Sequence, residues 1–99
     1  MRKKFIIMLH EVTSEQEKAF GKLLTENGLY WWHWLSNAWL AIDDEGGKQV
    51  GQIRDFVNQA FGDTRNLVIE MPEGSGTWAG RGPTTEDKDM FAWIRKNWT

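Results

Sequence analysis

The chain has 99 residues, a formal net charge of −2 at pH 7 and a hydrophobic fraction of 40%, which together predict one domain with a modest core. It contains no cysteine, so disulfides, thiolate metal sites and a cysteine nucleophile are excluded. The slightly acidic balance does not favour nonspecific binding to nucleic-acid phosphates, which usually needs a basic face.

The first residues predict a strand and not a targeting segment. The basic residues 2–4 precede an apolar run at 5–9, which is too short for a signal-peptide core and has no cleavage site after it. No run is long or apolar enough to span a membrane. We therefore expect a cytoplasmic protein.

Alternation over residues 4–12 describes the first strand in more detail. Two sets of apolar side chains point to opposite faces: Phe5, Ile7 and Leu9, against Ile6 and Met8. Such a pattern is typical of a central strand that is buried on both faces.

Residues 13–27 predict the first helix. Two residue pairs fit a capping box at its start: Thr13 with Gln16, and Ser14 with Glu17. Phe20 and Leu24 belong to an apolar stripe at helical spacing. Gly28 stands where a left-handed residue ends many helices.

An aromatic hairpin follows the first helix. Residues 29–35 and 38–43 predict two strands, and Ser36 and Asn37 form the turn between them. The two strands hold four of the seven tryptophans. So much aromatic surface must face a core, a partner or a ligand. The acidic loop at 43–47 lacks the spacing of a calcium site.

The next two elements are a helix at 48–61, which Gly62 ends, and a short buried strand at 67–71, which Pro72 stops. The C-terminal part predicts a turn at 73–76, a short edge strand at 77–80 and a helix at 86–97. Thr85 would cap that helix, and its inner side would carry Met90, Phe91, Ile94 and Trp98.

This order of elements predicts an α+β, ferredoxin-like fold. A β-α-β-β-α-β arrangement over residues 1–72 places both helices on one face of a four-stranded antiparallel sheet. Residues 73–99 form an extension of the same single domain, 1–99. The other face of the sheet stays open unless the C-terminal helix, a second protomer or a ligand covers it.

The hairpin motif carries a resemblance to a known group. The run Trp31-Trp32-His33-x-Leu35-Ser36-x-x-Trp39-Leu40, followed by Leu67-Val68-Ile69-Glu70 and Trp78-Ala79-Gly80, resembles the small SinR-like proteins, which are similar to the CRISPR-associated Cas2 family. The resemblance implies a ferredoxin-like homodimer that acts as a scaffold. In Cas2 proteins an Asp at the end of the first strand is proposed to bind a divalent metal. Glu11 takes that place here, and His10 replaces the preceding Tyr.

Glu11 and His10 are therefore the candidate catalytic residues, and Glu11 is the candidate metal ligand. A Glu from each protomer could hold Mg²⁺ together with water and substrate phosphates. The alternative is that Glu11 is an exposed residue near the first helix and that His10 forms an ordinary hydrogen bond. We favour this alternative, because fold analogy is weak ground for chemistry.

The remaining candidates are aromatic. Six residues could bind a ligand or form an interface: Trp31, Trp32, His33, Trp34, Trp39 and Trp78. Alternation places His33 on one face with Trp31 and Leu35, opposite Trp32 and Trp34. Aromatic rings on such a sheet can stack bases, but basic residues are not interleaved with them here. We favour a protein interface, where Trp is common.

The sequence therefore predicts a homodimeric scaffold or interaction module without strong catalysis and without a cofactor. Another protein is a possible partner, and nucleic acid is possible but not favoured by net charge. The first alternative is a divalent-metal-dependent nuclease that uses Glu11 across the dimer axis, with Mg²⁺ as its cofactor. The second is a small nucleic-acid-binding module.

Overall fold

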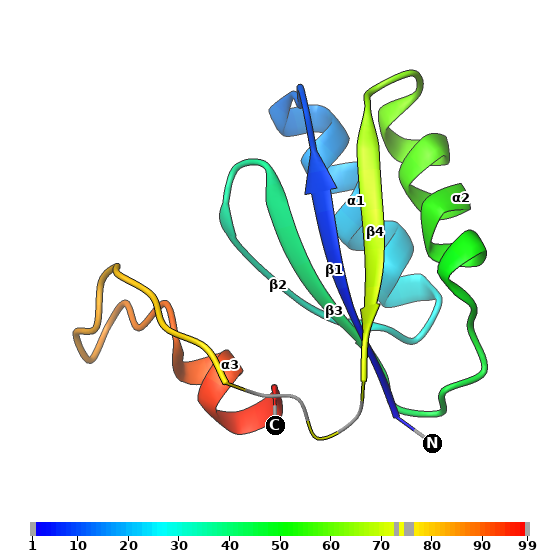
Figure 1. The fold of residues 1–99 in the computed structure, drawn as a ribbon. Coiled ribbons are helices and arrows are strands. Elements are labelled where there is room, and N and C mark those ends of the chain that lie inside the picture. Colours follow the sequence, from blue (N-terminus) through cyan, green and yellow to red (C-terminus); the bar gives the residue numbers. More distant parts are fainter. Residues whose placement is uncertain (1, 73, 75–76, 99) are drawn as a thin grey trace.

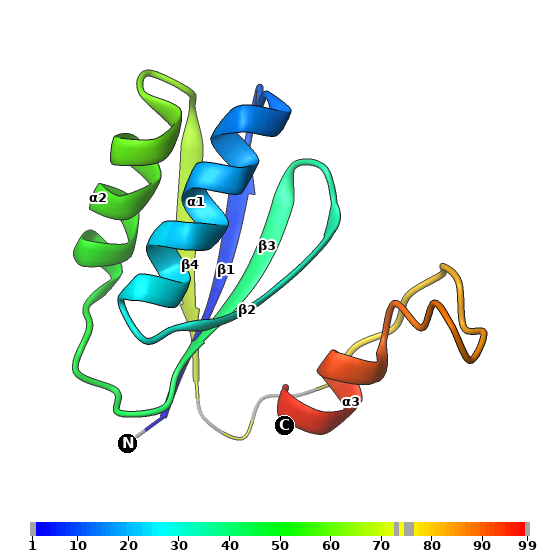
Figure 2. The same cartoon turned by 180° about the vertical axis from the view of Figure 1, so that it is seen from behind.

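The computed structural model describes residues 2–72, 74 and 77–98. Its elements follow in this order: β1 (Lys3–Leu9), α1 (Ser14–Glu26), β2 (Tyr30–Leu35), β3 (Ala38–Asp43), α2 (Val50–Phe61), β4 (Asn66–Met71) and α3 (Ala92–Asn97). The strands form one antiparallel sheet in the order β2-β3-β1-β4. The predicted β-α-β-β-α-β fold is therefore confirmed, and Figures 1 and 2 show α1 and α2 together on one face.

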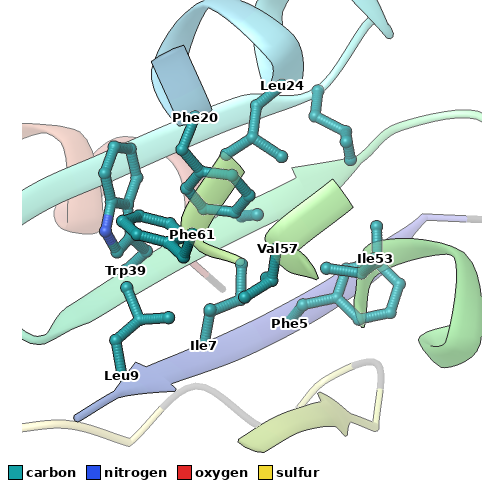
Figure 3. Close-up of a cluster of buried hydrophobic side chains, with 11 residues drawn as sticks. Phe5, Ile7, Leu9, Phe20, Leu24, Trp39, Ile53, Val57 and Phe61 are labelled. Atoms are coloured by element: carbon teal, nitrogen blue, oxygen red, sulfur yellow. The ribbon is translucent and has the colours of Figure 1, made fainter. Parts of the chain in front are cut away.

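The main core lies between this helical layer and the sheet. Every second residue of β1 points into it, including Phe5 and Ile7, which are fully buried. Trp39 of β3 meets the ring of Phe20 of α1 edge to face, at 4.8 Å between centroids (Figure 3). Each large apolar side chain buried in this way stabilises the fold by about 1.5–3 kcal/mol relative to exposure.

Capping residues set the ends of α1. The backbone N–H of Gln16 donates to Thr13 Oγ1 at 3.2 Å, and the N–H of Thr13 donates to Gln16 Oε1 at 2.9 Å. This pair, and not the alternative at Ser14, forms the capping box. Gly28 has a φ of +78° after α1 and Gly62 has a φ of +64° after α2. Gly28 thus has the positive φ that the sequence predicts, and Gly62 ends α2 as predicted, also with a positive φ.

A second cluster lies on the opposite face of the sheet. The last residues of the chain fold back over one end of that face, so that Phe91, Ile94 and Trp98 pack against Trp32 and Ile42 (Figure 1). The indole N–H of Trp32 donates to the carbonyl of Met90 at 2.7 Å. The C-terminal segment therefore covers part of the open face, and its predicted inner residues are confirmed.

Two C-terminal predictions are wrong. Residues 77–80 form no strand, and α3 begins at Ala92 and not at residue 86. The backbone N–H of Lys88 donates to Thr85 Oγ1 at 3.2 Å, so the threonine closes a local turn and does not cap the helix. The predicted turn at 73–76 lies mostly outside the described residues.

The burial predicted for two strands is also wrong in part. Among the described strands, β4 pairs with β1 alone and forms an edge of the sheet. Its side chains Leu67 and Ile69 are 55% and 39% exposed, and Met8 of β1 is 37% exposed. These side chains point to the open face, beyond the end that the C-terminal segment covers. Alternation could not reveal this, because coverage of a sheet face depends on distant residues.

Candidate functional site

Glu11, the candidate metal ligand after the end of β1, is exposed to solvent. Glu11 and His10 are both exposed, and their side chains approach to 3.7 Å between Nε2 and Oε1. They line an open groove together with Asp63 and Arg65. Among the described residues, no group of three His, Cys, Asp or Glu side chains is placed to hold a metal ion.

His33 belongs to the helix side of the sheet. Its Nε2 lies 2.9 Å from Glu17 Oε2, and its ring stacks on Trp39 at 3.9 Å between centroids. Burial lowers the pKa of His33, and the nearby Glu17 carboxylate opposes that shift only in part. The histidine is thus held mainly neutral, as a packed residue of the core edge.

Trp31 completes this packed group. Its ring lies 5.0 Å from that of Trp39, and its indole N–H donates to Thr25 Oγ1 at 3.0 Å. A Cβ at Gly21 would come within 3.0 Å of the Trp31 ring, so the glycine allows the ring to lie against α1. Trp31, His33 and Trp39 therefore pack together, and Trp31 remains 36% exposed at the edge of this group.

The predicted alternation in β2 holds through His33 and fails before Leu35. The register of the β2–β3 pair shifts between Trp32 and Leu35, because a bulge interrupts the strand. Leu35 consequently lies on the open face with Trp32 and not on the face of His33 as predicted. Trp34 is 44% exposed.

The C-terminal segment and the open face enclose a cavity of about 350 Å³. We call it the aromatic pocket, and we define it by the lining residues Trp32, Leu40, Trp78, Arg81, Phe91 and Trp98. Trp78 stacks on Phe91 at 5.3 Å between ring centroids. The structure thus brings together Trp32 and Trp78, which are two of the predicted interface residues.

The uncovered end of the open face carries an apolar strip, which we define as Met8, Leu67 and Ile69. Cross-strand pairing places Met8 opposite Leu67, one step along from the pair Ile6 and Ile69. Sequence reasoning missed this strip, because it interpreted both strands as buried. The only available signal was the apolar side chain at every second position of β4.

The strip borders an open strand edge. The N–H of His10 donates to the carbonyl of Arg65 at 3.0 Å. In an antiparallel pair, every second residue directs its N–H and C=O groups to the neighbouring strand. Counting from Arg65, these residues of β4 are Leu67 and Ile69, whose backbone groups therefore face β1. The N–H and C=O groups of Val68 and Glu70 therefore face outward, where no strand of the described residues lies beside β4.

In comparisons with known proteins, no family model, curated protein or solved structure matches the chain. None of the helices in the described part of the chain is long and apolar enough to cross a membrane. The function must therefore be inferred from the geometry.

Proposed function

We propose that the chain is a non-catalytic interaction module that works as a homodimer, in which β4 of one protomer pairs with β4 of its partner. The observation that carries the proposal is the unpaired β4 edge beside the apolar strip. A regular edge strand with exposed apolar side chains and little charge is a template for strand pairing. β4 has one charged residue, Glu70. The resemblance of the hairpin motif to the SinR-like proteins points to the same function.

The other edge of the sheet is less suited to pairing. Strand β2 contains the bulge between Trp32 and Leu35, and bulges protect natural edges by disturbing the ladder. Strand β4 pairs with β1 without a shift in register. Regular geometry therefore favours β4 as the joining edge.

A second copy is the partner that β4 fits by symmetry. A two-fold axis perpendicular to the sheet keeps the open faces of both protomers on the same side. Each open-face residue of β4 must then lie opposite an open-face residue of the partner's β4. Because open-face residues alternate along the strand, this is possible only if the axis passes at one residue and not between two. An axis at Ile69 places Ile69 opposite itself and Leu67 opposite Met71. The two apolar strips then lie side by side, and Glu70 lies opposite Val68. An axis at Glu70 would place two carboxylates together, which is unfavourable.

The outward backbone groups supply the bonds of this interface. With the axis at Ile69, the N–H of Glu70 donates to the carbonyl of Val68 in the partner, and the reverse bond also forms. Strand addition gains its affinity from such main-chain bonds. The exposed apolar strips beside the joint would add hydrophobic contact.

The test removes one outward N–H and keeps everything else. Glu70→Pro deletes a donor that β1 does not use, and proline is tolerated where an edge N–H faces solvent. Glu70→Ala is the matched control, because it removes the same charge and keeps the donor. In sedimentation equilibrium we expect a dimer for the wild type and for Glu70→Ala, and a monomer for Glu70→Pro.

A second variant tests the apolar strip. Ile69→Lys would place two ammonium groups at the axis, so it should also give a monomer, because like charges directly opposite each other repel. A wild type that stays monomeric at millimolar concentration would contradict the proposal. A Glu70→Pro variant that dimerises as tightly as Glu70→Ala would exclude the β4 edge.

A further inference from the structure

We propose that the aromatic pocket is a binding site for a small planar aromatic anion. This inference does not rest on the homodimer, because neither Glu70 nor the apolar strip lines the pocket; Met71, at the end of β4, is the strand residue that does. Its volume of about 350 Å³ falls at the lower end of the range for small-molecule sites. The pocket therefore suits a ligand of one or two rings.

Aromatic rings from distant parts of the chain line the pocket. Trp32 comes from β2, Trp78 from the segment after β4, and Phe91 and Trp98 from the C-terminal end. Trp32 is held in place by its bond to the Met90 carbonyl, and Trp78 by its stack on Phe91. Rings fixed in this way offer flat apolar surfaces, which favour a flat apolar ligand.

Glycines hold the 77–82 segment close to the C-terminal residues. A Cβ at Gly80 would lie 2.6 Å from the ring of Phe91, and a Cβ at Gly82 would lie 2.1 Å from Met90 Sδ. Both distances are far below van der Waals contact, so a side chain at Gly80 would displace the buried Phe91 ring, whereas the flexible Met90 side chain could move away from one at Gly82. The 77–82 segment, which forms one side of the pocket, is therefore closely packed against Met90 and Phe91.

The charge of the lining selects the ligand. Among the described residues that line the pocket, Arg81 is the charged one, and none is acidic. Arg81 forms no ion pair or hydrogen bond with any described residue. A cationic ligand would find no counter-charge here, whereas a carboxylate or sulfonate could accept hydrogen bonds from the guanidinium. The lining therefore favours an anion.

Two fluorescent probes test the proposal, because they differ in charge and share an aromatic frame. Naphthalene-2-sulfonate is the planar two-ring anion, and naphthalene-2-sulfonamide is its neutral counterpart. Arg81→Gln should weaken the sulfonate about tenfold, equivalent to about 1.4 kcal/mol, and leave the neutral probe within about twofold. Arg65→Gln is the matched control at an exposed arginine outside the pocket.

Site-specific readouts separate the pocket from other apolar surface. The sulfonate should shift the indole N–H resonance of Trp78 and leave that of Trp34 in place. Leu40→Trp should fill the pocket and displace both probes. If that variant fails to fold, Arg81→Gln still decides the question.

Two results would overturn the proposal. The first is equal sulfonate affinity in the wild type and Arg81→Gln. The second is loss of sulfonate binding in Ile69→Lys, which would place the probe on the apolar strip. Sulfonate affinity should be the same in Glu70→Pro as in the wild type, whatever the oligomeric state of the variant. The proposals of the pocket and of the homodimer are therefore tested separately.

Discussion

Replacing Trp32 should destabilise the chain far more than replacing Trp34, although the two residues stand two positions apart in β2. Trp32 is 6% exposed and Trp34 is 44% exposed. Truncating a buried tryptophan to alanine costs about 3–5 kcal/mol, whereas surface substitutions usually stay within about 0.5 kcal/mol. Trp32→Ala should thus remove a large part of the roughly 5–15 kcal/mol that stabilises a typical domain.

A milder variant isolates the hydrogen bond. Trp32→Phe keeps an aromatic ring but leaves the Met90 carbonyl, now bonded to the indole at 2.7 Å, without its donor. An unsatisfied buried acceptor costs about 1–3 kcal/mol. We expect the free energy of unfolding to fall in the order wild type, Trp32→Phe, Trp32→Ala.

Urea denaturation followed by circular dichroism measures these differences. All variants are compared at one protein concentration, because dimerisation would stabilise each of them by mass action. Trp34→Ala is the matched control. Equal losses in Trp32→Ala and Trp34→Ala would refute the placement of Trp32 in a buried cluster under the C-terminal segment.

Three further outcomes follow from single contacts. Burial lowers the pKa of His33 despite Glu17, so the unfolded chain binds a proton at this histidine more readily than the folded chain. The free energy of unfolding should therefore fall as the pH drops below about 6.5. His33→Gln should weaken this dependence on pH, measured by denaturation at several pH values. The wild type should not cleave labelled single- or double-stranded DNA or RNA with Mg²⁺ or Mn²⁺, and metal-dependent cleavage that Glu11→Ala abolishes would indicate a nuclease. Gly80→Ala should cost roughly 1–3 kcal/mol, measured by thermal denaturation, because its Cβ would overlap the Phe91 ring.

Local patterns in the sequence were sufficient to predict the fold. The period of the apolar residues separates the helices from the strands, and Thr13, Gly28 and Gly62 mark helix ends through their own backbone chemistry. These signals need only neighbours within a few positions. The β-α-β-β-α-β order then limits the sheet to few arrangements.

The candidate site could be predicted only in part, because it depends on contacts between distant residues. The sequence identified Trp32 and Trp78 as candidates, but it could not show that the C-terminal segment would bring them to one pocket. The bulge after Trp32 reversed the face of Leu35. The exposure of Ile69 follows from the edge position of β4, which alternation does not encode.

The β4 pairing itself can be tested by a single cysteine, because the native chain has none. With the two-fold axis at Ile69, the two copies of this residue form a non-hydrogen-bonded pair, whose Cα atoms lie about 4.5 Å apart. That separation is within the range of a disulfide. Ser36→Cys in the exposed hairpin turn is the control. Under mild oxidation at micromolar concentration, we expect Ile69→Cys to form a covalent dimer and Ser36→Cys to stay monomeric; a monomeric Ile69→Cys, or equal crosslinking of both variants, would contradict the homodimer through β4.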